Sequence, residues 1–379
     1  MILFLLTFFI LYGSLHLYVF LKAKAAFVFS AQTSIYLALV MIIMVFSPII
    51  VRLSEKAGLE PFARLLSYVG YIWMGILFLF VSSSLLIDIY RFLVYLISII
   101  ARRDFVSITP SARISFIMPL LFSLLIATYG YFEAKNIRTE RIIINTSKIP
   151  EEVGRLKIVQ ISDVHLGLIV REERLKRILN IVKMENPDIL VSTGDLVDGQ
   201  IDNLSGLAGP LNEINPRYGK FAITGNHEFY AGLNQALNFT EKAGFRILRG
   251  ERFTIGEMIT IAGVDDPQGR TYGLFREDSE KEVLSGLPVE KFTLFLKHRP
   301  LADKSTIGLF DLQLSGHAHK GQIFPFSLIT KLYYPADSGC LNLVDNSYMY
   351  VNRGAGTWGP PIRFLSPPEV AVIELVHKP

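Results

Sequence analysis

The segment LKIVQISDVH, residues 156–165, joins an apolar, β-branched run to an Asp-x-His motif. The run predicts a buried strand over residues 156–162, so that Asp163 and His165 would lie where the strand ends. In open α/β sheets, functional side chains gather at the carboxyl ends of the strands. This segment therefore predicts an α/β fold with a site at one edge of its sheet.

The same arrangement recurs along the second half of the chain. Four more apolar runs occupy residues 188–193, 220–224, 292–297 and 312–315. The motifs that follow the five runs are DVH at 163–165, GDLVD at 194–198, GNHE at 225–228, His298, and GHAH at 316–319. Helical periodicity over residues 171–185 separates the first two runs, which predicts a β-α-β unit with parallel strands and a right-handed crossover. Five strand ends are thus expected to converge on one rim.

Histidine is concentrated in these motifs. The chain contains seven histidines, and five of the six beyond residue 134 fall inside the motifs. Imidazole, carboxylate and amide groups together suit Mn, Fe, Zn or Co better than Ca. Two such cations would acidify a water molecule and draw charge from phosphoryl oxygens. The motifs therefore predict a two-metal hydrolytic site, although each motif alone is a weak signal.

The first part of the chain has a different composition. Residues 1–134 carry nine Lys/Arg and five Asp/Glu, whereas residues 135–379 carry 29 of each kind. Four segments approach the roughly 20 apolar residues that a membrane-spanning helix needs; they cover residues 2–21, 33–51, about 65–87 and about 114–132. Residues 88–100 could prolong the third helix or lie along the interface. We predict a transmembrane domain over 1–134, a connector over 135–154 and a catalytic domain over 155–379.

The flanking charges give a weak indication of orientation. The first segment has no basic region before its apolar run, which favours a retained anchor over a cleaved signal peptide. A cytoplasmic N-terminus places seven Lys/Arg near the helix ends on the inner side, against five for the opposite orientation. We therefore expect a multi-pass protein of the cell membrane with a cytoplasmic catalytic domain.

Several polar features have a structural explanation. His16, in the first apolar segment, is expected to form a helix–helix hydrogen bond rather than to bind a ligand. Asp88 and Arg91 have a helical spacing that permits a local ion pair. The single cysteine, Cys340, excludes an intrachain disulfide. The charge balance of residues 135–379 argues against nucleic acid as a partner.

The order of the five motifs resembles the calcineurin-like metallophosphoesterase superfamily, over about residues 155–379. Residues 316–322 (GHAHKGQ) are similar to the GHTHGGQ signature of its membrane-associated YkuE-like branch, and residues 350–356, 361–363 and 368–369 also resemble that branch. Lys320 stands where the signature has glycine, and it could add positive charge near a phosphate or face solvent. The resemblance implies a four-layer α/β/β/α sandwich after the helical transmembrane domain.

The resemblance also implies the ligands of two divalent metal ions. The first metal would be held by Asp163, His165 and His319. The second would be held by Asn226, His298 and His317. Asp195 would bridge the two metals.

Two residues are expected to take part in the reaction itself. They are Asp195, through the metals, and His227, which would protonate the leaving oxygen or steady the transition state. Asp198 would orient a ligand or its loop. Arg299 could form a surface salt bridge or contact the phosphate. Asp265 and Asp266 are expected to form a turn rather than bind metal.

These observations predict a membrane-anchored phosphodiesterase or pyrophosphatase that uses two metal ions. Four spans exceed what tethering requires, so the expected partners are the lipid bilayer and a lipid-linked phosphoester such as a phospholipid or UDP-diacylglucosamine. The alternative is a membrane binding or regulatory module with a non-catalytic metallophosphoesterase fold. A transporter is disfavoured because the apolar segments lack paired charges.

Overall fold

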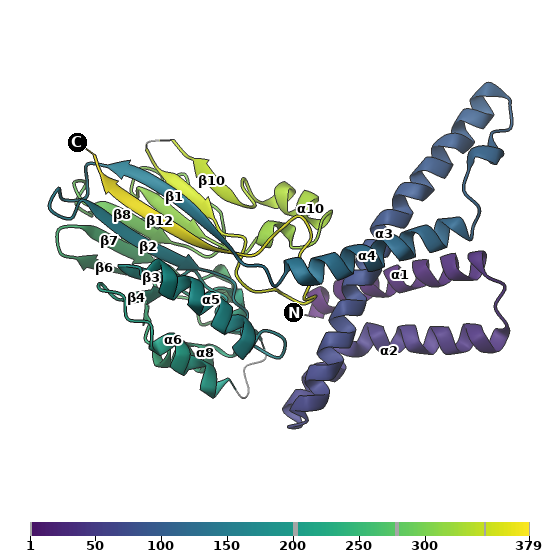
Figure 1. The fold of residues 1–379 in the computed structure, drawn as a ribbon, viewed down its shortest axis with the longest axis horizontal. Coiled ribbons are helices and arrows are strands. Elements are labelled where there is room, and N and C mark those ends of the chain that lie inside the picture. The colour runs from purple at the N-terminus through teal and green to yellow at the C-terminus, as the bar shows by residue number, and fades with distance from the viewer. Residues whose placement is uncertain (1, 200–203, 277–279, 345, 379) are drawn as a thin grey trace. The chain divides into compact units, whose positions relative to one another are not determined.

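Two compact units make up the chain in a computed structural model, which describes residues 2–199, 204–276, 280–344 and 346–378. One unit comprises Met1–Phe132 with Gly359–Ile362, and the other comprises Glu133–Trp358 with Arg363–Pro379. The first unit is helical, and the second contains the β-sheets (Figure 1).

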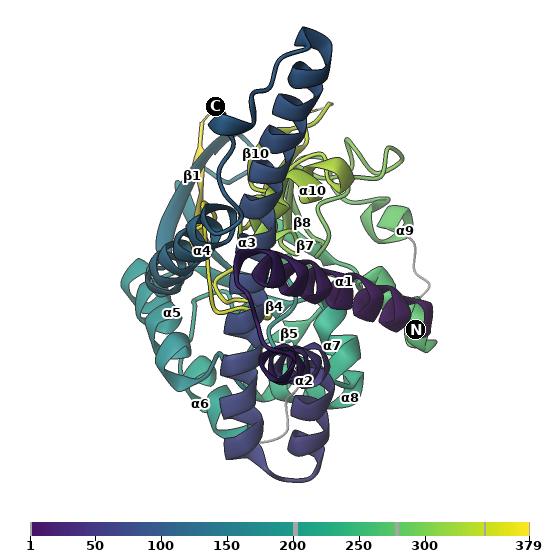
Figure 2. The same cartoon turned by 90° about the vertical axis from the view of Figure 1, so that its right-hand side faces the viewer.

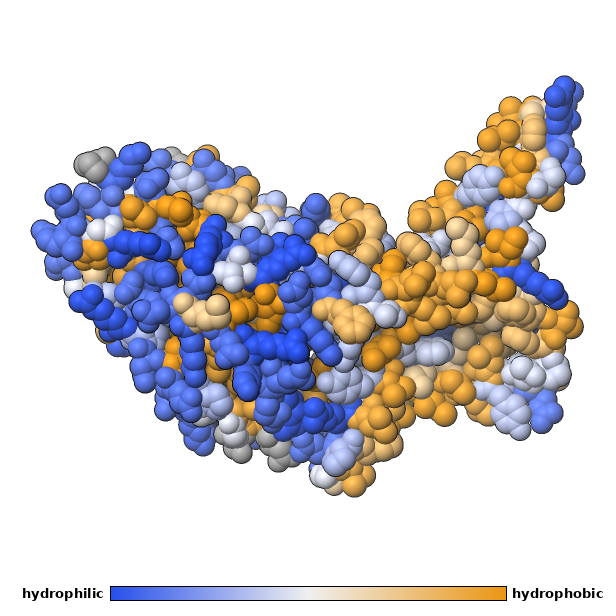
Figure 3. Space-filling model, viewed as in Figure 1, coloured by the Kyte–Doolittle hydropathy of each residue, from blue (hydrophilic) through white to orange (hydrophobic). Residues whose placement is uncertain are grey.

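The helical unit is built from long apolar helices. They are α1 (Ile2–Ala26), α2 (Ala31–Lys56), α3 (Glu60–Ala101) and α4 (Ile114–Glu133). A short 3-10 helix, η1 (Val106–Ile108), lies between the last two. Within the described residues these four helices are long and apolar enough to cross a membrane, and apolar residues dominate their surface (Figure 3). The four predicted apolar helices are confirmed, and residues 88–100 prolong the third.

Polar side chains connect α1 with α3. Trp73 Nε1 donates a hydrogen bond to His16 Nε2 at 2.8 Å, which confirms the expected helix–helix contact of His16. Asp88 accepts a hydrogen bond from the Tyr18 hydroxyl at 2.6 Å and forms an ion pair with Lys22. Asp88 therefore pairs with a lysine of another helix, where the sequence suggested a local pair with Arg91.

Two mixed six-stranded sheets form the centre of the second unit. The first sheet has the order β1 (Arg138–Thr146), β12 (Glu369–His377), β2 (Arg155–Ile161), β3 (Ile189–Ser192), β4 (Lys220–Ala222) and β5 (Arg246–Ile247). The second has the order β10 (Gly339–Asn342), β11 (Tyr348–Val351), β9 (Leu312–Ser315), β8 (Phe292–Leu296), β7 (Ile259–Gly263) and β6 (Glu251–Ile255). The predicted parallel β-α-β unit is confirmed, because β2 pairs in parallel with β3 across α5 (Glu172–Glu185).

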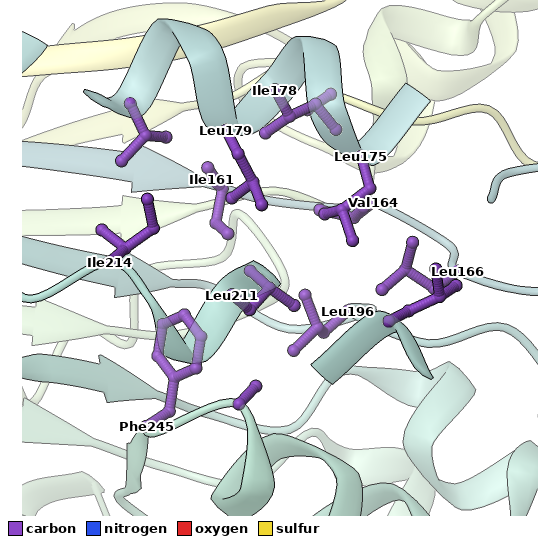
Figure 4. Packing of buried hydrophobic residues seen from close by; sticks show 14 of the residues in the cluster. Ile161, Val164, Leu166, Leu175, Ile178, Leu179, Leu196, Leu211, Ile214 and Phe245 are labelled. Carbon is purple, nitrogen blue, oxygen red and sulfur yellow. The ribbon is translucent and has the colours of Figure 1, made fainter. Parts of the chain in front are cut away.

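Helices cover the outer faces of both sheets (Figures 1 and 2). Buried side chains of α5, α6 (Ala208–Asn212) and α8 (Leu233–Lys242) share one core with β2, β3 and β12. Figure 4 shows part of this core, with Leu175, Ile178 and Leu179 of α5 lying over Ile161 of β2. On the other side, α9 (Glu280–Leu284) packs on β7 and β8.

A second core fills the space between the two sheets. Ile158, Ile189 and Phe221 of the first sheet lie in one cluster with Ile261 and Leu294 of the second. Burial of such side chains is the main force that holds two sheets together. The predicted four-layer α/β/β/α sandwich is therefore confirmed.

The expected connector, residues 135–154, contains strand β1, which the sequence analysis did not predict. β1 pairs in parallel with β12 along its whole length, from Arg138 opposite Glu369 to Thr146 opposite His377. Only every second residue of β1 is half-buried, because it is an outer strand that covers the core with one face. Its charged and polar residues therefore prevent the apolar run that would have predicted a strand. The sandwich thus includes part of the expected connector.

Candidate metal centre

The five motifs lie at the carboxyl ends of strands in both sheets. Asp163 and His165 follow β2, Asp195 follows β3, and Asn226 begins the short helix α7 (Asn226–Ala231) after β4. In the second sheet, His298 follows β8, while His317 and the 3-10 helix η4 (His319–Gly321) follow β9. Since β2, β3 and β4 are parallel, as are β8 and β9, the chain turns into the site at the same end of each strand.

Three groups of imidazole and carboxylate atoms meet at this edge. The groups are Asp163, His165 and His319; His165, Asp195 and His227; and Asp195, His298 and His317. Within each group the potential ligand atoms lie within 4.8 Å of one another. The groups overlap through His165 and Asp195, so they form one continuous cluster. This cluster contains six of the seven predicted metal ligands, and the seventh, Asn226, adjoins it.

The first set of predicted ligands surrounds one carboxylate. His319 Nε2 lies 3.3 Å from Asp163 Oδ1 and 3.1 Å from His165 Nε2. Both oxygens of Asp163 accept the backbone N–H of His317, at 3.0 and 3.1 Å. The carboxylate is thus held in place while one oxygen and two imidazole nitrogens face a common point.

The second set is arranged around His298. Its Nε2 lies 3.3 Å from Asp195 Oδ2, 3.3 Å from Asn226 Oδ1 and 3.2 Å from His317 Nδ1. His298 Nδ1 lies 2.7 Å from the carbonyl oxygen of Thr193, which would accept a hydrogen bond from the ring N–H and fix the ring.

Asp195 lies between the two sets. Its Oδ1 accepts the backbone N–H of His227 at 2.8 Å, so this oxygen is occupied. Its Oδ2 is 3.3 Å from His298 Nε2 and 3.8 Å from His165 Nε2. A single oxygen of the Asp195 carboxylate therefore faces both sets of predicted ligands.

This donor set fits divalent cations. Asp163 and Asp195 are buried carboxylates, and buried charges need a compensating partner or a metal. Nitrogen atoms of neighbouring imidazole rings face each other in pairs. A cation shared by the two rings of a pair would be a binding partner for both nitrogen atoms. Mixed nitrogen and oxygen donors suit transition metals.

The backbone at the cluster is held in an unusual conformation. Five residues of the cluster have positive φ angles near 50–70°, although none is glycine: Asp163, His165, Asp195, His317 and His319. For residues with a Cβ, this left-handed region costs about 1–2 kcal/mol each. Such strain gathers where function requires a particular geometry. Here each strained residue turns its side chain toward the common centre.

Protonation of the imidazoles differs across the cluster. Burial, together with His227 and His319, lowers the pKa of His165 to about 3. Burial and His298 lower the pKa of His317 to about 4. Both rings are therefore neutral near neutral pH, the form that binds metals. Burial favours the neutral acid at Asp195, but His298 and His227 hold its pKa well below the usual range.

His227 forms a pair with Asp198 beside the cluster. Its Nδ1 lies 2.7 Å from Asp198 Oδ1, and its ring centroid is 4.6 Å from that of His165. Burial opposes the charged form, but Asp195 and Asp198 raise the pKa of His227 to about 9. A protonated imidazole held in this way can donate a proton or a hydrogen bond to a developing oxyanion.

Comparison with known proteins agrees with this geometry. The profile of the family described as "Calcineurin-like phosphoesterase" matches residues 156–321. An uncharacterized metallophosphoesterase of Aquifex aeolicus (strain VF5) is 43% identical over 260 residues, covering 68% of this chain and 99% of the relative. The chain belongs to the calcineurin-like metallophosphoesterase family.

Two further relatives are also described as metallophosphoesterases, and one of them is described as a transmembrane protein. The uncharacterized metallophosphoesterase YkuE of Bacillus subtilis (strain 168) is 34% identical over 262 residues, covering 65% of this chain and 89% of the relative. A protein of Danio rerio described as "Transmembrane protein with metallophosphoesterase domain" is 32% identical over 274 residues, covering 68% of this chain and 62% of the relative. The family resemblance is thus confirmed, and the four helices that are long and apolar enough to cross a membrane, together with the Danio rerio relative, indicate a membrane protein.

Glu228, whose role the sequence analysis left open, connects two loops of the metallophosphoesterase site. Its buried carboxylate accepts backbone N–H groups of Gly225 at 2.6 Å, Leu196 at 2.8 Å and Asp195 at 3.0 Å. Burial and the nearby Asp195 carboxylate raise the pKa of Glu228 to about 7. The residue is the last of the GNHE motif, so its position was visible in the sequence, but its partners Asp195 and Leu196 belong to the preceding motif.

Arg363 is a second positioning residue of the metallophosphoesterase that was not predicted. Its guanidinium is fully buried, with Nη2 donating to the Gly356 carbonyl at 2.7 Å and lying 3.0 Å from His319 Nδ1. Nη1 donates to the Arg353 carbonyl at 2.8 Å. Arg363 thereby joins the loop after β11 to the ring of a predicted metal ligand. Its only sequence signal was the resemblance of residues 361–363 to the YkuE-like branch.

The charged residues near the rim of the metallophosphoesterase form fixed pairs. Arg299 donates to both oxygens of Asp266, at 2.8 and 2.9 Å, so it forms the salt bridge that was one of its two predicted roles. Asp266 also caps the 3-10 helix η3 (Pro267–Tyr272) by accepting the Gln268 N–H, as expected of a turn former. Asp265 accepts three hydrogen bonds from the Arg249 guanidinium.

Glycine is required in the metallophosphoesterase motifs for two reasons. Gly194 has a φ of 92°, a turn that side chains rarely permit. Gly316 lacks a positive φ, but a Cβ there would lie 2.1 Å from Asp163 Oδ2. At Gly316 the close approach of the Asp163 carboxylate, rather than a turn, is therefore what excludes a side chain. Lys320 has a φ of 49°, which explains why the family signature has glycine at this position.

Proposed function

We propose that the chain is a membrane-anchored phosphoesterase, either a phosphodiesterase or a pyrophosphatase, that depends on two divalent metal ions. The observation that carries this proposal is the overlap of the three ligand groups through His165 and Asp195. The family is typically dependent on two metals, which agrees with two neighbouring sets of donors. The metals would be Mn, Fe, Zn or Co.

Each residue has a role in this proposal. Asp163, His165 and His319 would hold one cation, Asn226, His298 and His317 would hold the other, and Asp195 would bridge them. The cations supply an acidified water and neutralise charge on the phosphoryl oxygens. His227 protonates the departing oxygen, and Asp198 keeps its ring oriented and charged. Glu228 and Arg363 hold the loops that carry these ligands.

We further propose that the substrate is a lipid-linked phosphoester. The four apolar helices exceed the single anchor that would keep a soluble enzyme at a membrane. A phospholipid or a nucleotide–lipid pyrophosphate such as UDP-diacylglucosamine combines a phosphoryl centre with acyl chains. An enzyme held at the bilayer would meet such a substrate at high local concentration.

The proposal is tested with the full-length protein purified in detergent and supplied with Mn²⁺. Hydrolysis of bis-p-nitrophenyl phosphate, UDP-diacylglucosamine and common phospholipids is compared at equal enzyme concentration. We expect at least one lipid to be turned over well above the generic diester. Turnover of the generic diester alone would contradict the lipid-linked substrate while leaving the metal site in place. Bound metal without turnover of any phosphoester would favour the non-catalytic regulatory module.

We also propose that the catalytic unit faces the cytoplasm of a multi-pass protein in the cell membrane, on the basis of the flanking positive charges. The single cysteine, Cys340, is exposed in the catalytic unit and provides a direct test. A membrane-impermeant maleimide should label Cys340 in inverted vesicles but not in intact cells. The Cys340→Ser variant is the matched control. Labelling in intact cells would place the catalytic unit outside.

A further inference from the structure

Helix α10 (Phe326–Tyr333) has an unusual distribution of apolar residues. Leu328, Ile329, Leu332 and Tyr333 recur at the spacing of one helical face, and all four are exposed. Leu332 keeps 85% and Tyr333 79% of its surface accessible. Helices on the surface of a protein in water normally place this face against the core.

The opposite face of α10 carries smaller polar side chains. Ser327 and Thr330 are less exposed than their apolar neighbours, and the Thr330 hydroxyl donates to the Ser327 carbonyl at 3.0 Å. The polarity of the helix is therefore reversed relative to a helix that faces water. Exposure of contiguous apolar side chains is unfavourable in water and indicates an apolar partner.

Both ends of α10 are joined to the candidate metal centre. At its start, Ser327 of α10 packs closely against Gly321. A Cβ on Gly321 would lie only 2.3 Å from the backbone nitrogen of Ser327. Gly321 ends the 3-10 helix that begins at the predicted ligand His319. At its end, the ring of Tyr334 lies 5.6 Å from that of His317. A binding partner that contacts the exposed face of α10 would thus lie close to the predicted metal ligands.

The chemistry of this segment matches the surface of a lipid bilayer. Residues 312–336 contain no Asp or Glu, whereas Lys320 and Lys331 are positively charged. Leucine, isoleucine, tyrosine and lysine on one short helix are typical of segments that lie at the boundary between headgroups and acyl chains. Four helices among the described residues are long and apolar enough to cross a membrane, and they would keep the catalytic unit beside a bilayer.

We propose that α10 is a membrane-docking helix, which inserts its exposed apolar face into the lipid surface and thereby holds the metal centre at the headgroup level. Its occupant is the bilayer, rather than a second copy of the chain or another protein. The docking surface does not depend on the proposed hydrolysis, because it is defined by exposure and polarity alone. Lys331 lies beside the apolar face, where its charge meets anionic headgroups.

The test uses the full-length protein in proteoliposomes of phosphatidylethanolamine and phosphatidylglycerol. Cys340 is replaced by serine, and an environment-sensitive fluorophore is attached at Leu332→Cys. The matched control carries the fluorophore at Val289→Cys, which is equally apolar and 79% exposed but precedes β8, at the edge of the sheet away from the metal centre. Lipids with a spin label on the acyl chain serve as quenchers.

We expect the fluorophore at position 332 to emit at shorter wavelength and to be quenched at least about twofold more strongly than at position 289. In the same background, Leu328→Glu should abolish this difference, whereas Leu328→Phe should preserve it. Equal emission and quenching at both positions would overturn the proposal. A shift to shorter wavelength without quenching by the lipids would also overturn it, since a protein surface would then cover the helix.

Discussion

Replacing Asp195 with asparagine is expected to lower phosphoester turnover on the order of 10³-fold or more, because it removes the negative charge that faces both sets of metal ligands. Asp195 Oδ2 lies 3.3 Å from His298 Nε2 and 3.8 Å from His165 Nε2. A neutral amide cannot balance two cations, so the metal content should fall together with the rate. The measurement is turnover of the best substrate and metal analysis on the same preparation.

Asp198→Asn is the matched control for this prediction. It makes the same chemical change three residues away, at a carboxylate that contacts His227 rather than the predicted ligands. We expect it to retain the bound metal and to lose activity by only about 10- to 100-fold. Equal loss of metal in both variants would show that Asp195 contributes no more to metal binding than Asp198 does.

The pH profile of Asp198→Asn tests the role of His227. Asp195 and Asp198 together raise the pKa of His227 to about 9 against the effect of burial. If His227 acts as the general acid, turnover falls as the pH rises through this pKa. Loss of the Asp198 charge lowers the pKa, so the alkaline limb of the Asp198→Asn profile should move to lower pH. An unchanged limb would exclude His227 as the group that titrates there.

Glu228→Ala is expected to destabilise the catalytic unit by about 3 kcal/mol or more, because it leaves three buried backbone N–H groups without their acceptor. These groups belong to Gly225, Asp195 and Leu196, at distances of 2.6 to 3.0 Å from the carboxylate. For a unit of this size, such a loss corresponds to a fall of roughly 6–12 °C in the melting temperature. Thermal unfolding of the detergent-purified protein measures it.

Glu228→Gln gives the graded control. The amide keeps one oxygen that can accept some of the same N–H groups, but it places a donor where the second oxygen was. We therefore expect an intermediate loss of stability and partial retention of metal. If alanine and glutamine variants were as stable as the parent, the carboxylate would not be what holds the two loops together.

Much of the site was predictable because its pattern is local. An apolar strand followed at once by a ligand is a short-range arrangement, and it recurs at five places in the chain. The strands at 156–162, 188–193, 220–224, 292–297 and 312–315 all form within one or two residues of their predicted bounds. The long apolar helices were predictable for the same reason, since length and composition alone define them.

The errors and omissions involve residues that act over long sequence distances. Strand β1 was assigned to a connector because its polar residues mask a strand that buries only one face. β12 pairs with both β1 and β2, more than 200 residues away, which no local pattern reveals. Arg363 was visible only through the resemblance of residues 361–363 to the YkuE-like branch, and its contact with His319 depends on the folded chain.

The sequence by itself determined the predicted ligand types, their order at the strand ends, the α/β class and the four apolar helices. The tertiary structure alone decided which oxygen of Asp195 faces both sets, which carboxylate binds His227, and that α10 turns its apolar side outward. The physical reason is the range of the interactions. Backbone propensity and hydrophobic periodicity act over a few residues, whereas hydrogen bonds at the site and the exposure of a face depend on segments that meet only when the sheets pack together.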